Sequence, residues 1–274
     1  MSDDFELFTS VLQSLEEVGI LSSVVIIGGW AQILYRQYFK DPPELSVLRT
    51  RDIDILFARP LIIKPVGNLE EALAARGFDR IYGEDGTTKF STPEAEIEFL
   101  VPERGRGDEK PYLIKELAIR ASSLRLVDML MVDPLEVRYG KYKIKIPDPI
   151  RFCFNKLLVS QRRKKKEKRE KDLGTAFEIA ALLSRFPKWR KLLSVRLEEL
   201  PKKQRALVLS LLKQNDSPAV AAATTAAMGV AGVGHVGAMR TGLTPGGPWP
   251  RPREPDGPLG GPVGGPTGRG GHRI

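Results

Sequence analysis

The stretch Thr50-Arg51-Asp52-Ile53-Asp54-Ile55-Leu56 decides the fold of this chain. Its isoleucines alternate with the two aspartates, which is typical of a β-strand with one buried face. Side chains two residues apart on a strand project from the same face, so the carboxylates of Asp52 and Asp54 lie close together. Like charges at that spacing repel unless a cation lies between them. An isolated Asp-x-Asp pair also occurs on ordinary solvent-exposed strands, so the flanking sequence has to separate the two interpretations.

Upstream, the run Ser23-Val24-Val25-Ile26-Ile27 predicts a buried strand that ends at Gly28-Gly29. A helix is expected from Trp30 to about Tyr38, because Pro42-Pro43 cannot continue it. Glycines let the backbone approach an anion closely, and a helix N-terminus offers free N–H groups to phosphate. Alone, such a turn is more often a packing feature. Trp30 is expected in the core rather than as a platform for stacking a base.

Downstream, two strands are expected over 87–92 and 95–101, around a turn at Pro93. Glu96 and Glu98 share one face of the second strand. If this strand pairs beside the Asp-x-Asp strand, one glutamate completes a three-carboxylate site suited to Mg²⁺ or Mn²⁺. The bulky apolar neighbours of Glu98 favour it as the third ligand, with Glu96 as the alternative. Either glutamate alone also fits a solvent-exposed edge.

The remaining patterns complete an α/β (α+β) architecture, a mixed sheet flanked by helices and followed by a helical bundle. Further helices and strands are expected at 5–18, 68–76 capped by Asn68, 136–139 and 142–146 around Gly140, and, as helices, 149–163, 165–184, 187–199 and 201–213. The last 60 residues hold 15 glycines and 9 prolines with no apolar period, which predicts disorder. The expected division is 1–147 (catalytic α/β domain), 148–214 (helical domain) and 215–274 (disordered tail).

Composition excludes several chemistries. The chain has 274 residues, one cysteine and two histidines, and both histidines, His235 and His272, fall in the tail. Residues 1–214 therefore contain no Ser-His-Asp triad, no Cys-His pair, no His- or Cys-built zinc site and no disulfide framework. The acidic N-terminus does not resemble a secretory signal, and no stretch is apolar enough to span a membrane. A lone cysteine fits a reducing compartment, so a soluble, cytoplasmic protein is expected.

The formal net charge of +9 is uneven along the chain. Between Arg151 and Asp172 ten Lys or Arg residues face three acidic ones. This excess favours a polyanion, either RNA or a nucleoside triphosphate. A solvated helix or linker is an equally good interpretation, and Lys168 with Asp172 also fits an i, i+4 surface pair.

Taken in order, the strand–Gly-Gly–helix, the Thr-x-Asp-Ile-Asp motif and the Ile-Glu-Phe-Leu stretch resemble the nucleotidyltransferase superfamily with the DNA polymerase β-like fold. The closest likeness is to the minimal and toxin-type enzymes of abortive-infection and toxin–antitoxin systems. The resemblance covers about Val24 to Leu183. Many members have Gly-Ser where this chain has Gly-Gly-Trp, so that only backbone N–H groups serve the phosphates there.

The resemblance implies roles for particular residues. Gly28 and Gly29 would hold the triphosphate of an NTP, together with Thr50 and Arg51. The metal ligands for Mg²⁺ or Mn²⁺ would be Asp52, Asp54 and Glu98 or Glu96. In the helical half, Pro149-Ile150-Arg151-Phe152, Asn155-Lys156-Leu157-Leu158 and Lys171-Asp172-Leu173 are similar to the toxin-type relatives. Lys156 would contact phosphate, Lys171 would line the same cleft, and Asp172 would act as a base or orienting group.

The expected function is metal-dependent transfer of NMP from an NTP to an RNA or tRNA end or to a protein hydroxyl. A role as the toxin of a toxin–antitoxin pair, with an antitoxin as partner, is left open, because the neighbouring genes would decide it. Such chemistry depends on positioning and electrostatics, so it needs no histidine. Two alternatives stay open: a catalytically inactive module of the same fold that binds nucleic acid or a partner, and a transferase acting on a small antibiotic such as an aminoglycoside. No membrane partner is expected.

Overall fold

The computed structural model describes residues 3–46, 49–105 and 110–215. The predicted tail, 215–274, lies outside the described residues apart from Asn215. Within the described ranges, no helix combines the length and the apolar character needed to cross a membrane.

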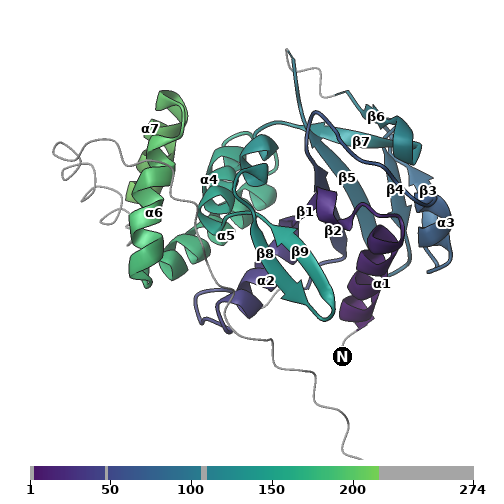
Figure 1. Cartoon of the computed structure of the whole chain (residues 1–274). Coiled ribbons are helices and arrows are strands. Elements are labelled where there is room, and N and C mark those ends of the chain that lie inside the picture. Colours follow the sequence, from purple (N-terminus) through teal and green to yellow (C-terminus); the bar gives the residue numbers. More distant parts are fainter. Residues whose placement is uncertain (1–2, 47–48, 106–109, 216–274) are drawn as a thin grey trace, which may run out of the picture. The chain divides into compact units, whose positions relative to one another are not determined.

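One mixed sheet carries the N-terminal half of the chain (Figure 1). Its strands are β1 (Val24–Ile27), β2 (Asp52–Phe57), β3 (Asp79–Tyr82), β4 (Thr88–Ser91), β5 (Glu96–Pro102), β6 (Tyr112–Ile114) and β7 (Ile119–Leu124). The order is β1-β2-β5-β4-β3, with β2 and β5 parallel and the other three pairs antiparallel. Along one edge of β5, β4 pairs with the first residues of the strand and β7 pairs with its last residues. Strand β6 in turn pairs with β7. The mixed sheet of the expected fold is confirmed.

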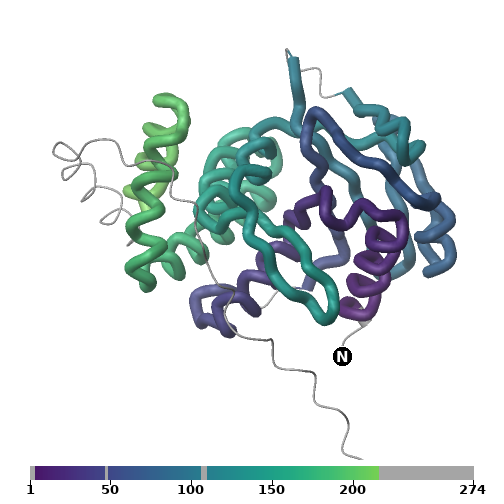
Figure 2. The backbone as a smooth tube through the Cα atoms, viewed as in Figure 1, coloured from purple at the N-terminus to yellow at the C-terminus, as the bar shows by residue number. Residues whose placement is uncertain are grey.

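Helices and one hairpin complete the described chain. The α-helices are α1 (Asp3–Glu17), α2 (Gly28–Tyr38), α3 (Leu69–Ala74), α4 (Pro149–Ser160), α5 (Lys166–Ser184), α6 (Pro187–Glu198) and α7 (Lys202–Gln214). Short 3₁₀ turns are η1 (Leu21–Ser23), η2 (Lys115–Leu117) and η3 (Val127–Met131), and the hairpin consists of β8 (Leu135–Tyr139) and β9 (Tyr142–Ile146). Figure 2 follows the backbone from the sheet through this hairpin into the four consecutive helices.

Alternating apolar residues explain the core of the sheet. Ile53 and Ile55 of β2 and Ile97 of β5 are almost completely buried, because they point to the face opposite the carboxylates. Trp30 on α2 is 1% exposed and stacks on Phe8 of α1, with 3.8 Å between the ring centroids. The interpretation of Trp30 as a core residue is therefore confirmed.

The start of α4 connects the helices to the sheet. The Asp148 carboxylate caps this helix by accepting hydrogen bonds from the backbone N–H groups of Ile150 and Arg151, at 2.9 and 3.1 Å. The hydroxyl of Tyr35 on α2 donates to the carbonyl of Pro147 at 2.8 Å. Because the side chains of Asp148 and Tyr35 are both buried, these hydrogen bonds fix the direction in which α4 leaves the hairpin.

Several predicted boundaries differ from the structure. The helix predicted to reach residue 163 ends at Ser160, and the one capped by Asn68 ends at Ala74 rather than Arg76. The helix before Pro42-Pro43 ends at Tyr38, as predicted, but begins at Gly28 rather than at Trp30. Beyond its end, Lys40 and Asp41 adopt left-handed backbone angles. Sequence patterns missed β3 and β6, which are short, and β7, a six-residue strand with three polar or charged residues among apolar ones.

Candidate active site

The glycine pair lies against the Asp-x-Asp strand. Gly28 has a φ of +64°, and a Cβ there would lie 1.8 Å from the Oδ2 atom of Asp54. A Cβ on Gly29 would lie 2.8 Å from the hydroxyl oxygen of Thr50. Only glycine lets the strand β1 turn directly into α2 while these two side chains approach.

The first turn of α2 is open to an anion. The helix starts at Gly28 itself, no side chain caps its N-terminus and no acidic residue lies in its first turn. Its first backbone N–H groups and the positive end of the helix dipole therefore face the region beside Asp54. This arrangement suits a phosphate group.

Four carboxylates meet on β2 and β5. In the parallel register Asp52 pairs with Glu96 and Asp54 pairs with Glu98, so two stretches more than 40 residues apart in sequence lie side by side. Burial raises the pKa of Asp54 to about 6, and the charges of Glu98 and Asp52 add to the shift. The face thus carries more negative charge than its own surroundings neutralise.

The two glutamates have different partners. The Nζ atom of Lys89 on β4 donates to Oε1 of Glu96 at 2.7 Å. The hydroxyl of Ser122 on β7 donates to Oε1 of Glu98 at 2.7 Å. Sequence reasoning missed Lys89 and Ser122. The hairpin turn at Pro93 could have placed Lys89 opposite Glu98, whereas nothing local indicates that β7 joins β5.

Burial opposes ionisation of Lys89, but the hydrogen bond to Glu96 and the charges of Glu98, Glu96 and Asp52 outweigh it and raise its pKa. Lys89 is therefore a permanent cation on the carboxylate face at neutral pH.

Helices α4 and α5 contribute an ion-paired triad. Asp172 is buried, and its carboxylate accepts from the Nζ atom of Lys156 at 2.7 Å and from the Nε atom of Arg163 at 2.8 Å. Burial alone would raise the pKa of Asp172, but these two cations hold it below its ordinary value. The alternative pairing of Asp172 with Lys168 is wrong, since its partners come from α4 and the α4–α5 connection.

The triad reaches the carboxylates through Lys156, whose charge lowers the pKa of Asp54. Lys156, from the helical half, therefore lies near enough to Asp54 for its charge to act on that carboxylate. Lys171, next to Asp172 on α5, is exposed and forms no ion pair with the described residues.

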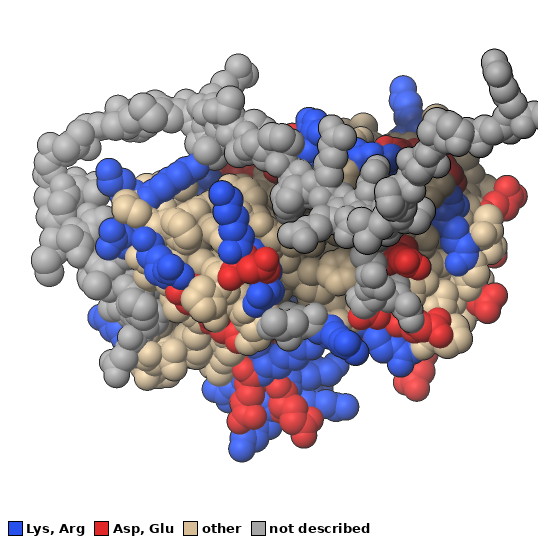
Figure 3. Space-filling view, turned by 90° about the horizontal axis from the view of Figure 1, so that it is seen from below, with Lys and Arg blue, Asp and Glu red and all other residues tan. Residues whose placement is uncertain are grey.

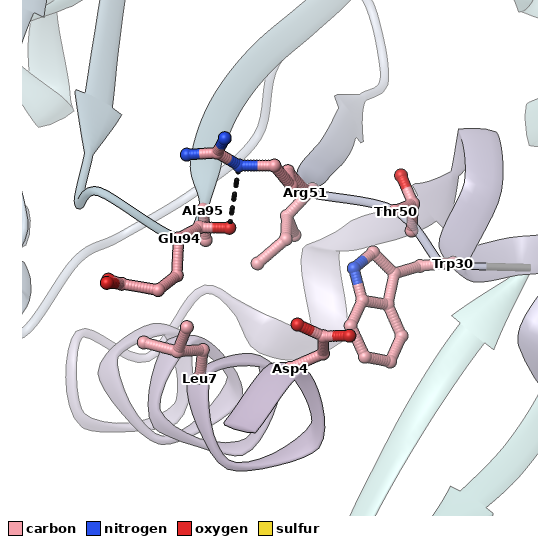
Figure 4. Close-up of a pocket in the computed structure, with 8 residues that line it drawn as sticks. Asp4, Leu7, Trp30, Thr50, Arg51, Glu94 and Ala95 are labelled. Carbon is pink, nitrogen blue, oxygen red and sulfur yellow. Dashed lines mark hydrogen bonds between the residues drawn. The ribbon is translucent and has the colours of Figure 1, made fainter. Parts of the chain in front are cut away.

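Thr50 and Arg51 lie at the entrance to β2. The hydroxyl of Thr50 donates to the carbonyl of Asp52 at 3.3 Å, and the Nε atom of Arg51 donates to the carbonyl of Glu94 at 3.1 Å. Arg51 borders a shallow depression that also includes Trp30 and Ile53 (Figure 4). This depression has no room for a water-sized sphere, and Ile53 places it across the sheet from the carboxylates, so it is not a nucleotide pocket.

The donor set is entirely oxygen, which fits Mg²⁺ or Mn²⁺. Within the described residues, no three Asp, Glu, His or Cys side chains already converge on a point where a metal ion would lie. Glu96 and Glu98 instead turn to Lys89 and Ser122. Both of these hydrogen bonds use the Oε1 atom of the glutamate.

Three solved structures are similar to parts of this chain. The solution structure of the antibiotic-resistance factor ANT(2'')-Ia has 12% sequence identity and a TM-score of 0.39, covering 71% of this chain and 91% of that one. Its crystal structure in complex with adenylyl-2''-tobramycin has 10% identity and a TM-score of 0.40, covering 77% and 98%. An antigenic nucleotidyltransferase-like protein from Paracoccidioides brasiliensis has 17% identity and a TM-score of 0.38, covering 75% and 93%.

These likenesses are too distant to assign a substrate or a site. No curated protein matches the chain in sequence. A family model described as nucleotidyltransferase matches residues 6–192, which is more than half of the chain and includes the glycine pair, all four carboxylates and the Lys156–Asp172 pair. The chain therefore belongs to this nucleotidyltransferase family of enzymes, which transfer nucleotidyl groups.

Proposed function

We propose that this enzyme transfers NMP from an NTP to RNA in a reaction that requires Mg²⁺ or Mn²⁺. The observation that carries the proposal is the parallel pairing of β2 with β5, which sets Asp52 and Asp54 opposite Glu96 and Glu98. The open N-terminus of α2 lies at the same place, because the Asp54 carboxylate touches Gly28. Metal ligands and a phosphate-binding turn side by side are what transfer from an NTP needs.

Asp52, Asp54 and Glu98 are the proposed metal ligands. Asp54 and Glu98 face each other in register, and the pKa of Asp54 is raised first by burial and then by the negative charges of Glu98 and Asp52. A bound divalent ion supplies charge neutralisation for the triphosphate and for the attacking oxygen. The acceptor hydroxyl attacks the α-phosphorus in line, and pyrophosphate leaves.

The remaining residues bind and orient the donor. The backbone N–H groups of Gly28 and Gly29 receive phosphate oxygens, since no hydroxyl side chain follows them. Lys156 contributes a positive charge beside the leaving pyrophosphate. We assign Asp172 a positioning role, because its buried carboxylate is occupied by Lys156 and Arg163 and fixes the lysine.

An exposed basic segment, Gln161–Lys171, favours RNA as the acceptor. It comprises the connection between α4 and α5 and the first turns of α5. It holds eight Lys or Arg residues against two glutamates, and nearly all of its side chains are exposed. Figure 3 shows one face of the molecule, on which Lys and Arg side chains (blue) gather in groups with a few Asp and Glu side chains (red) among them. The segment adjoins the triad through Arg163, so RNA held there lies near the donor.

The decisive experiment incubates the full chain with each labelled NTP, Mg²⁺ and total cellular RNA, protein or an aminoglycoside in separate reactions. The double variant Asp52→Asn with Asp54→Asn should lose transfer at least a thousandfold. The matched control, Asp79→Asn with Glu84→Gln, removes the same two charges from exposed positions at the far edge of the sheet. Full transfer by the double variant would refute the enzyme assignment of these residues.

Acceptor choice is tested with the basic segment. Charge reversal at Lys164, Lys165 and Lys168 should weaken RNA binding at least tenfold and reduce the slope of log K against log salt by about 2. The control reverses three exposed lysines on α6 and α7, namely Lys191, Lys202 and Lys203. Labelling of protein or the aminoglycoside but not RNA would overturn the RNA assignment. RNA binding without any transfer would instead support an inactive binding module.

The helical-half motifs around Lys156 and Lys171-Asp172, which resemble those of toxin-type nucleotidyltransferases, support a biological role that we propose as well, that of a cytoplasmic toxin neutralised by an antitoxin. Induced expression in a bacterial host should then arrest growth, while the Asp52→Asn, Asp54→Asn variant should not. Equal growth of both strains at equal protein levels would contradict the toxin role and leave the transfer reaction unaffected.

A further inference from the structure

A lysine lies inside the acidic face of the sheet. In the antiparallel register of β4 and β5, Lys89 is directly opposite Glu98. Its ammonium does not bond that partner but reaches diagonally to Glu96, with 2.7 Å between Nζ and Oε1. The side chain of Lys89 is 24% exposed, so the pair is partly shielded from water.

The two candidate third ligands are therefore held differently. Glu98 accepts from a neutral hydroxyl, that of Ser122, and stands opposite Asp54. Glu96 accepts from a cation, and charge-assisted hydrogen bonds are roughly twice as strong as neutral ones. A metal ion can take Glu98 from a serine more readily than it can take Glu96 from a lysine.

We propose that Lys89 is a positioning residue that selects Glu98 as the third metal ligand by holding Glu96 out of the site. This inference rests on the proposed metal-dependent function. It assigns a role to β4, a strand of this face that contributes no carboxylate ligand. It also accounts for two glutamates at i and i+2 where only one is needed.

The selection can be reversed by mutation. Loss of Lys89 frees Glu96, which lies opposite Asp52 and can replace a missing Glu98. Lys89→Met should therefore rescue metal binding in a Glu98→Gln background. Simple removal of a nearby positive charge would also favour a cation, but that effect would not depend on Glu96.

The experiment measures Mn²⁺ affinity of the full chain by calorimetry and electron paramagnetic resonance, without nucleotide. Glu98→Gln should weaken Mn²⁺ binding at least tenfold, and Glu96→Gln less than threefold. Adding Lys89→Met to Glu98→Gln should raise the Mn²⁺ affinity at least fivefold over that of Glu98→Gln alone. Adding Glu96→Gln to this double variant should abolish the gain in affinity. Lys89→Arg, which keeps the ion pair, should not rescue.

Lys143→Met serves as the matched control, because Lys143 also pairs with a glutamate, Glu136, but within the β8–β9 hairpin, which is a separate sheet from β2 and β5. Melting temperatures verify that each variant folds. Equal losses from Glu96→Gln and Glu98→Gln, or no rescue by Lys89→Met, would overturn the inference. If Asp52→Asn with Asp54→Asn leaves Mn²⁺ affinity unchanged, the proposed metal site itself fails, which is a different result from failed rescue.

Discussion

Asp54→Asn should stabilise the metal-free protein at neutral pH. The carboxyl of Asp54 has a pKa of about 6 in the folded chain against an ordinary value of 3.8, chiefly because of burial and then because of Glu98 and Asp52. One pKa unit corresponds to about 1.4 kcal/mol. Ionised Asp54 therefore costs the fold up to about 3 kcal/mol, and a neutral asparagine of the same shape avoids that cost.

The sign of the pH dependence follows from proton linkage. Between about pH 4 and pH 6 the folded chain binds more protons at Asp54 than the unfolded chain does, so the free energy of unfolding falls as pH rises. Above about pH 7 Asp54 is ionised in both states and this contribution is constant. The advantage of Asp54→Asn should thus be full at pH 7.5 and should vanish near pH 4.

Urea unfolding in EDTA, followed by tryptophan fluorescence, measures this difference at each pH. Asp79→Asn, an exposed aspartate on β3, provides the control and should show no such dependence. Addition of Mg²⁺ at pH 7.5 should stabilise the wild type and not Asp54→Asn. A wild type that is the more stable protein at pH 7.5 in EDTA, or a difference independent of pH, would refute the electrostatic argument.

Three further predictions concern single residues. Gly28→Ala should unfold at lower temperature and lose transfer, because its Cβ would lie 1.8 Å from a carboxylate oxygen and its φ is +64°. The control is Gly174→Ala on α5, whose Cβ would meet no atom within 4 Å and which should melt no lower than the wild type. Asp172→Asn should cost about 3 kcal/mol in urea unfolding and raise KM for the NTP through Lys156; an unchanged KM would contradict the positioning role. Burial raises the pKa of Cys153 to about 12, so this thiol should react with a disulfide reagent only in urea, and rapid native labelling would contradict it.

Local patterns were sufficient to predict the strands that carry the site. Alternation identified β2 and β5 and assigned their carboxylates to one face, because each strand buries its other face. The β-branched run and the glycine pair located the turn into α2. Asn68 and Asp148 lie at the starts of helices that the apolar period had located, and both side chains accept backbone hydrogen bonds there.

Pairing between distant segments was beyond the sequence. The sequence of β2 does not indicate that its parallel neighbour, β5, lies more than 40 residues later. The register of this pair depends on how α3, β3 and β4 fill the connection between the two strands. The partners of Asp172 were also missed, because Lys156 lies on another helix and a sequence window shows only Lys168 four residues away. Lys89 was overlooked for the same reason: its partner Glu96 is seven residues away across a turn.

The cost of the acidic face is itself an argument for function. A domain has a net stability of about 5–15 kcal/mol, so a penalty of about 3 kcal/mol at Asp54 is a large share for one side chain. Asparagine would fit the same space, and the charges of Lys156 and Lys89 lower the pKa of Asp54 without cancelling the effect of burial. Gly28 adds to this loss of stability, because the Asp54 carboxylate can lie where it does only if residue 28 has no side chain. Such local conflicts with stability concentrate where a protein binds or reacts, and a divalent cation among these carboxylates would remove the conflict.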